Sequence, residues 1–286
     1  MSISWVDFSL TNCIKPFSLN LEKRDFLFLA GETCHDKLLR ALAGFAQEEC
    51  NQSDSIRIDG QRIRNNETFN SVLLPKNAAE SFPPRRTIGA FALDLLPGIT
   101  KKNLEIYAAG YGMEKNILYS KPSKISLPNL QRISLWLASL KKNSAIFVEE
   151  PEDGFFDEIR PFDFLQGLLK NEVTNCIVYL ASKKETILQK AKALQLCRTR
   201  LAVFCADRLV EEGYAAGILD NPVHPYTEEW LNLGTNSGQR KSGVLWQYCK
   251  PNCKEQHSCP AKQSKSSVMW DCGPGGLHKV ICRGFF

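Results

Sequence analysis

The N-terminal part of the chain has the hydrophobic pattern of β-structure. Residues 3–8 and 17–21 alternate apolar and polar side chains, and this period of two predicts strands with one buried face. Residues 26–29 are apolar throughout and predict a fully buried strand. Residues 55–63 surround an Asp-Gly pair, which is typical of a tight hairpin.

From residue 72 onwards, short apolar segments alternate with helical ones. The segments at residues 72–74, 145–148, 176–180 and 200–205 predict buried strands, and residues 87–95 begin a region with helical periodicity. This alternation predicts an α/β fold with a mostly parallel sheet. We expect the N-terminal strands to form an antiparallel edge of that sheet, and a helical insertion to occupy residues 85–140.

Length and charge narrow the class of protein. The 286 residues suffice for one large domain with an appendage, and a net charge of +5 is too mild and too dispersed to indicate nucleic-acid binding. Residues 1–25 lack a signal-peptide pattern, and no apolar stretch has the length of a membrane span, so we expect a cytosolic protein. In that compartment, the eleven cysteines are expected to be thiols or metal ligands rather than disulfides.

The segment after the buried strand at residues 26–29 has the outline of a phosphate-binding loop. The pattern G-x-x-x-x-G-K-[ST] places Gly31 and Lys37 correctly, but Asp36 replaces the second glycine and Leu38 replaces the hydroxyl residue. A carboxylate at position 36 would repel phosphate, and leucine cannot bind Mg²⁺. The alternative is an ordinary turn between a strand and a helix.

Two carboxylates end the strand at residues 145–148. Glu149 and Glu150 precede Pro151, where they could hold Mg²⁺ and polarise water as a general base. The alternative is a solvated acidic loop, because Glu152 and Asp153 follow closely.

Taken in order, these motifs resemble the ATP-binding subunit of an ABC transporter. The resemblance is to the oligopeptide/dipeptide/nickel group, including the antimicrobial-peptide-uptake type. The matching segments are residues 31–38 for the phosphate loop, Lys76 for the glutamine loop, residues 84–89 just after it, residues 125–132 for the signature, Glu149 and Glu150 for the second Walker motif, Ser182 for the switch histidine, and residues 221–227 for the N-P-x-H-P-Y-T motif of this group.

The resemblance implies a fold and a domain organisation. It implies a P-loop ATPase-like α/β core at residues 1–212 whose helical subdomain covers residues 85–140. A C-terminal extension with a cysteine cluster would follow at residues 213–286.

The resemblance also implies roles for individual residues. Gly31 and Lys37 would bind ATP, Glu149 would bind Mg²⁺, and Glu150 would act as the base. Ser126 would contact the ATP held by an opposite subunit. Because leucine and proline replace the signature glycines at positions 127 and 128, the alternative role of Ser126 is a helix N-cap.

Five cysteines lie in residues 246–286. Cysteines close together in a segment with few apolar residues suit a metal centre, while free thiols in a poorly ordered tail are the alternative. The resemblance favours a 4Fe–4S cluster, with Zn²⁺ as the other option. The expected ligands are Cys253, Cys259, Cys272 and Cys282, with Cys249 as an alternate to Cys272.

The implied function is the energy-coupling subunit of a peptide-type ABC importer at the cytoplasmic face of the bacterial inner membrane. Its implied partners are a second ATP-binding subunit, two membrane permease subunits and a binding protein that delivers peptide. Because both composite ATP sites would be altered, we expect a degenerate member of a heterodimer, with weak or absent ATP hydrolysis. The alternative is a non-catalytic docking or regulatory scaffold with a metal centre.

Overall fold

Strands from distant parts of the chain assemble into two sheets in the computed structural model of the protein. The structure describes residues 1–10, 13–32, 35–45, 56–63, 70–151, 161–181, 184–191, 194, 198–205, 208–232, 268–271 and 278–282. Within these residues, one sheet has eight strands and the other has four.

The larger sheet has the order β11-β12-β10-β9-β3-β8-β7-β6. From β9 to β6 all neighbours are parallel, as the alternating pattern predicted, whereas β10, β12 and β11 are antiparallel. Its strands are β3 (Asp25–Glu32), β6 (Ser71–Leu74), β7 (Asn143–Glu149), β8 (Thr174–Leu180), β9 (Arg198–Cys205), β10 (Arg208–Tyr214), β11 (Val268–Asp271) and β12 (His278–Cys282).

The N-terminal strands correct one prediction. They form a separate antiparallel sheet, in the order β2-β1-β4-β5, instead of an edge of the parallel sheet. These strands are β1 (Ile3–Leu10), β2 (Ile14–Leu21), β4 (Ile56–Ile58) and β5 (Gln61–Arg62). The reason is burial, because the apolar face of β1 and β2 packs over Leu27 and Leu29 of β3 in one cluster. The Asp-Gly hairpin is confirmed, with positive φ at Asp59 and Gly60.

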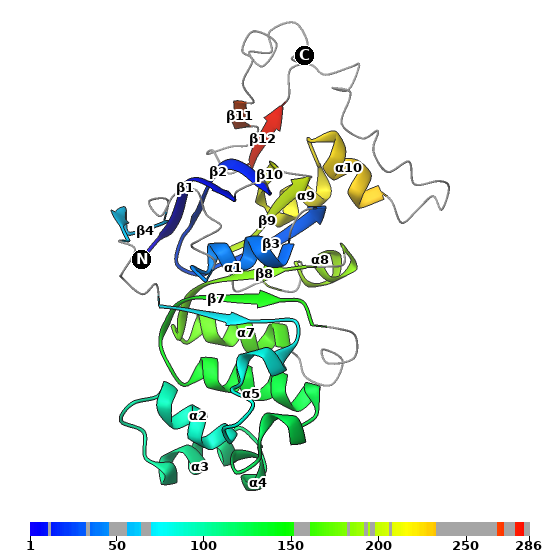
Figure 1. The fold of residues 1–286 in the computed structure, drawn as a ribbon. Helices are drawn as coiled ribbons and strands as arrows, with labels where there is room; N and C mark the ends of the chain where they lie inside the picture. Colours follow the sequence, from blue (N-terminus) through cyan, green and yellow to red (C-terminus); the bar gives the residue numbers. More distant parts are fainter. Residues whose placement is uncertain are drawn as a thin grey trace, which may run out of the picture.

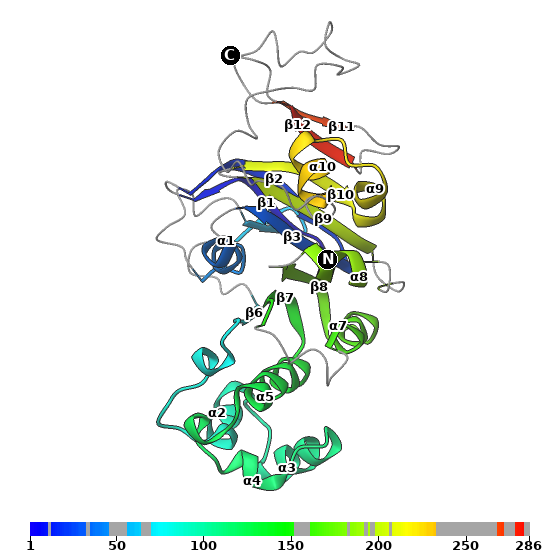
Figure 2. The same ribbon diagram turned by 90° about the vertical axis from the view of Figure 1, so that its right-hand side faces the viewer.

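Both faces of the larger sheet are covered. Phe26 and Phe28 belong to one core cluster and Leu27 and Leu29 to another, because successive side chains of a strand point to opposite faces. Figure 2 shows α1 on one face of the sheet and α7 and α9 on the other. The covering helices are α1 (His35–Leu42), α7 (Pro161–Lys170), α8 (Lys184–Lys190), α9 (Ala215–Asp220) and α10 (Pro225–Asn232).

Helices occupy much of the predicted helical insertion, and their buried residues form a core cluster of their own. It lies at the bottom of Figure 1, where α2, α3 and α4 gather beyond α5. Trp136 of α5 is 1% exposed within this core. The elements are η2 (Ala78–Ser81), α2 (Ile88–Leu95), α3 (Lys101–Gly110), α4 (Lys115–Leu118), η3 (Pro122–Lys124) and α5 (Leu127–Ser139).

Two short strands of the predicted C-terminal extension join the larger sheet. β12 pairs with β10, and β11 pairs with β12 (Figure 1). Residues 246–286 show almost no hydrophobic periodicity, so this pairing could not be predicted. No helix among the described residues is long and apolar enough to cross a bilayer.

Candidate functional site

The carboxyl ends of the parallel strands form the candidate site, since this edge is where ligands bind in doubly wound sheets. Glu149 ends β7, and the backbone N–H of Glu150 donates to Leu180 O at the end of β8 (3.0 Å). The Ala181 N–H in turn donates to Leu29 O of β3 (3.0 Å). These bonds bring the two carboxylates to the edge from which α1 begins.

Strand β3 extends into the phosphate-loop segment and restricts its backbone. β3 continues through Gly31 and Glu32, which pair with Phe204 and Cys205 of β9. Gly31 has φ +104°, and a Cβ atom there would lie 1.7 Å from Phe204 O. The backbone itself therefore requires glycine at this position, whether or not nucleotide binds.

The side chains of Lys37 and Leu38, at the end of this segment, differ in their exposure to solvent. Lys37 lies exposed on α1, whereas Leu38 is fully buried in the core beneath the small sheet. Restoring a hydroxyl by Leu38→Ser would therefore remove core volume, at a cost of about 2–5 kcal/mol. Thr33, Cys34 and the side chain of Asp36 lie outside the described structure, so the repulsion expected from Asp36 stays a prediction.

Glu149 is held from two sides. It is only 8% exposed, and its Oε2 accepts a hydrogen bond from Lys76 N (2.8 Å). Its Oε1 lies 3.7 Å from Arg40 Nε. The Lys76 carbonyl accepts a bond from Gln131 Nε2 of α5 (3.3 Å), so the glutamine-loop position joins β7 to the helical subdomain.

Glu150 is also buried, at 8% exposure, and accepts a hydrogen bond from the Thr186 hydroxyl of α8. Burial, and secondly the charge of Glu150, raise the pKa of Tyr179 far above its usual range. The alternative of a solvated acidic loop is therefore wrong for Glu149 and Glu150. If Glu150 acted as a base that polarises water, its carboxylate would do so while also accepting the hydrogen bond from Thr186.

Arg40 is a site residue that the sequence analysis missed. Besides Glu149, it pairs with Glu80 of η2 (3.0 Å). Its spacing of three residues from Lys37 places both on one face of α1, and this spacing was the signal that could have identified it.

Ser126 occupies the N-cap position of α5, as the alternative role predicted, but its side chain makes no capping hydrogen bond. That part of the prediction is wrong. Pro128 lies in the first turn, where a missing N–H costs little. The side chain of Ser126 is exposed, so its contact with an opposite subunit stays a proposal. Ser182 lies outside the described residues.

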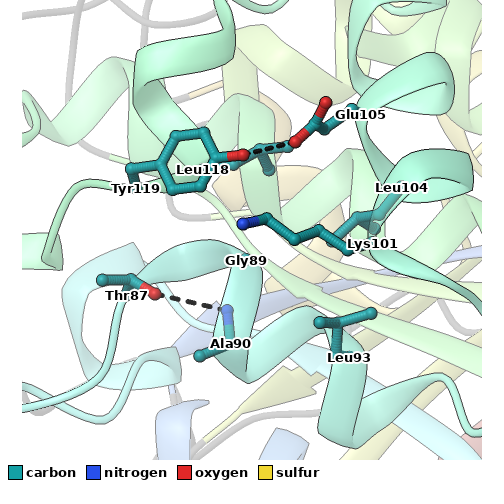
Figure 3. Close-up of a pocket in the computed structure, with 9 residues that line it drawn as sticks. All are labelled: Thr87, Gly89, Ala90, Leu93, Lys101, Leu104, Glu105, Leu118 and Tyr119. Atoms are coloured by element: carbon teal, nitrogen blue, oxygen red, sulfur yellow. Dashed lines mark hydrogen bonds between the residues drawn. The ribbon is translucent and has the colours of Figure 1, made fainter.

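The helical subdomain contains a small hollow of about 210 Å³, which is lined by residues of α2, α3 and α4 and of their flanking positions (Figure 3). Lys101 Nζ lies 4.7 Å from the centroid of the Tyr119 ring, and the Tyr119 hydroxyl donates to Glu105. The tyrosine hydroxyl and then Lys115 lower the pKa of Glu105. The lining residues are Thr87, Gly89, Ala90, Leu93, Lys101, Leu104, Glu105, Leu118 and Tyr119.

The motif at residues 221–227 has a structural explanation. The buried Glu211 carboxylate of β10 accepts bonds from Val223 N (2.9 Å) and His224 N (3.0 Å). His224 Nδ1 then accepts a bond from Tyr226 N (3.1 Å) and caps α10. Tyr226 is buried, so the motif anchors α10 against the sheet.

The state of His224 predicts a pH dependence of stability. Burial lowers its pKa to about 4, against an ordinary 6.5, with the Glu211 charge opposing the shift. The unfolded chain therefore binds more protons between these values, and stability is lost as pH falls from about 6.5 to 4, by up to about 3 kcal/mol. Urea unfolding at several pH values measures this loss. His224→Asn keeps a capping oxygen without titrating, so an undiminished pH dependence in that variant would contradict the assignment.

The metal prediction falls mostly outside the described structure. Cys249, Cys253, Cys259 and Cys272 are not described, and Cys282 is known only as the end of β12. Among the residues that are described, no group of three or more His, Cys, Asp or Glu side chains could hold a metal ion. Cys176 and Cys205 are buried and form no disulfide.

Comparisons with known proteins bear on this arrangement. The chain matches no protein-family model. It is 22% identical over 249 residues to the ATP-binding protein of the metal-staphylopine import system from two strains of Staphylococcus aureus, covering 80% of this chain and 88% of the relative. A bacterial Atm1-family ABC exporter with ATP bound superposes with a TM-score of 0.58 at 14% identity, over 82% of this chain and 42% of the exporter.

The chain has the fold of an ABC-type ATPase domain. The P-loop ATPase-like α/β core expected from the sequence is thereby confirmed. The division at residue 212 and the individual site roles stay predictions.

Proposed function

We propose that this chain is the energy-coupling, ATP-binding subunit of a peptide-type ABC importer and the degenerate member of a heterodimer. It would pair with a second ATP-binding subunit and dock on two permease subunits at the cytoplasmic face of a bacterial inner membrane. A binding protein would deliver peptide to the permeases.

The observation that carries this proposal is the similarity to an importer's ATP-binding protein over 88% of that protein's length. The order of the motifs supports it, because the phosphate-loop, glutamine-loop and second Walker positions all lie at one edge of the sheet or next to it. The N-P-x-H-P-Y-T motif, which fixes α10 on β10, supports the peptide and nickel group.

The degenerate role rests on the site itself. Leu38 carries no hydroxyl and is buried, Glu149 is bonded to Lys76 N and faces Arg40, and Glu150 is bonded to Thr186. A partner with intact motifs would then supply the hydrolytic site.

ATP turnover by the purified complex tests this proposal. We expect Glu150→Gln in this chain to change turnover less than about twofold, while glutamine at the matching glutamate of the second subunit lowers it about 100-fold or more. The isolated chain should hydrolyse ATP negligibly. Loss of turnover with Glu150→Gln would instead show that this chain hydrolyses ATP.

Co-purification separates the two candidate functions. A tagged chain that brings down permease subunits and a second ATPase supports the importer. The alternative, a non-catalytic scaffold, is favoured by the contacts that the Glu149 and Glu150 carboxylates already make with Lys76, Arg40 and Thr186.

Under either function we retain the proposal of a metal centre in the C-terminal segment. Its ligands would be Cys253, Cys259 and Cys282, with Cys272 or Cys249, and they would bind a 4Fe–4S cluster or Zn²⁺.

A further inference from the structure

Glu149 stands where the ABC fold implies a ligand for Mg²⁺, and its surroundings test whether the metal fits. Mg²⁺ requires a near-octahedral set of oxygen ligands at about 2.0–2.1 Å and keeps several of its waters. The second expected ligand is Leu38, which has no oxygen and is fully buried. Glu149 Oε2 is occupied by the Lys76 amide at 2.8 Å.

The remaining oxygen of Glu149 is closed to solvent. Oε1 is almost inaccessible to solvent and accepts no hydrogen bond from the described residues, so the arrangement does not expose it to a hydrated ion. Arg40 lies close to this oxygen, with its Nε 3.7 Å away. The residues present therefore do not fit Mg²⁺.

We propose that the Arg40 guanidinium replaces the divalent metal at this site, and that ATP binds here without Mg²⁺. The inference rests on the proposed function in that ATP is taken as the ligand. Arginine keeps its charge at every physiological pH, so the site holds a permanent cation. Glu80 fixes the guanidinium through an N–O contact of 3.0 Å.

Arg40 is also placed to reach a ligand. Its side chain is 41% exposed, and it shares one face of α1 with the exposed Lys37. A guanidinium offers several N–H donors in a fixed fork that matches phosphate oxygens. Two side-chain cations on one helix face thus suit a polyphosphate that carries no metal of its own.

The experiment compares ATP binding to the full chain in excess Mg²⁺ and in EDTA, by saturation-transfer NMR on the adenine protons, which detects weak binding. We expect the two affinities to agree within about threefold. Arg40→Met should weaken binding about tenfold in both buffers, the loss expected for one charge-assisted contact. Arg57→Met removes an equal charge from an exposed position on β4 and should leave the affinity unchanged.

Two results would overturn the inference. The first is binding at least tenfold tighter in Mg²⁺ than in EDTA, with that gain abolished by Glu149→Gln, which would place a metal on the carboxylate. The second is the absence of ATP binding in both buffers. Neither result bears on co-purification with permease subunits, so failure of the inference and failure of the proposed importer role are separable.

Discussion

Replacing Arg200 by methionine is expected to lower the free energy of unfolding by about 3–5 kcal/mol. Arg200 is 7% exposed on β9, lies 3.0 Å from Asp25 Oδ2, and pairs with Glu212 of β10. Asp25 is fully buried at the start of β3. Removing the guanidinium would take the cation from the buried Glu212 carboxylate and leave Asp25 with Arg198, whose Nε lies 3.1 Å from Asp25 Oδ1.

Chemical denaturation of wild type and variant measures this loss. Arg86→Met is the matched control, because Arg86 and Asp94 form an ion pair with both side chains about half exposed, and such pairs contribute roughly 0–1 kcal/mol. Similar losses in the two variants would contradict the assigned role of the buried network. Adding Asp25→Asn and Glu212→Gln to Arg200→Met should recover part of the stability, since no uncompensated charge remains.

Gly31→Ala is expected to destabilise the protein by more than about 3 kcal/mol in the absence of any nucleotide. The new methyl group would lie 1.7 Å from Phe204 O, which belongs to backbone and cannot move aside cheaply. The φ of +104° adds strain for any residue with a Cβ atom. β3 and β9 would have to separate at this point.

Gly60→Ala provides the comparison for this variant. Gly60 also has positive φ, at +78°, but nothing lies within 4 Å of an added Cβ. It should cost only about 1 kcal/mol, which isolates the backbone contact as the cause at Gly31. If Gly31→Ala were as mild as Gly60→Ala and lost only ATP binding, the glycine would serve the ligand rather than the fold.

The elements of the fold were largely predictable because hydrophobic period is a local property. Residues 26–29 and 176–180 became β3 and β8, and the Asp-Gly pair formed its hairpin. The placement of the N-terminal strands was not predictable, since alternation specifies a buried face but not what covers it. The pairing of β12 with β10 was missed because it joins segments far apart in sequence.

The sequence predicted where the candidate site lies better than it predicted which side chains contact each other there. Gly31, Lys37, Glu149 and Glu150 lie at or next to the expected sheet edge. The partners of the carboxylates, Arg40 and Thr186, come from helices whose packing the sequence does not specify. Ser126 shows the converse, because a residue at the correct N-cap position made no capping bond.

The pairing of β12 with β10 has a consequence for synthesis of the protein on the ribosome. β10 can pair with β9 as soon as both have emerged, but its other edge has no neighbour until residues 278–282 have been translated. Until then, its unpaired N–H and C=O groups are a template for strands of other chains. The nascent protein therefore carries an open sheet edge until residues 278–282 have been made, and a message truncated after α10 would encode a chain that never closes it.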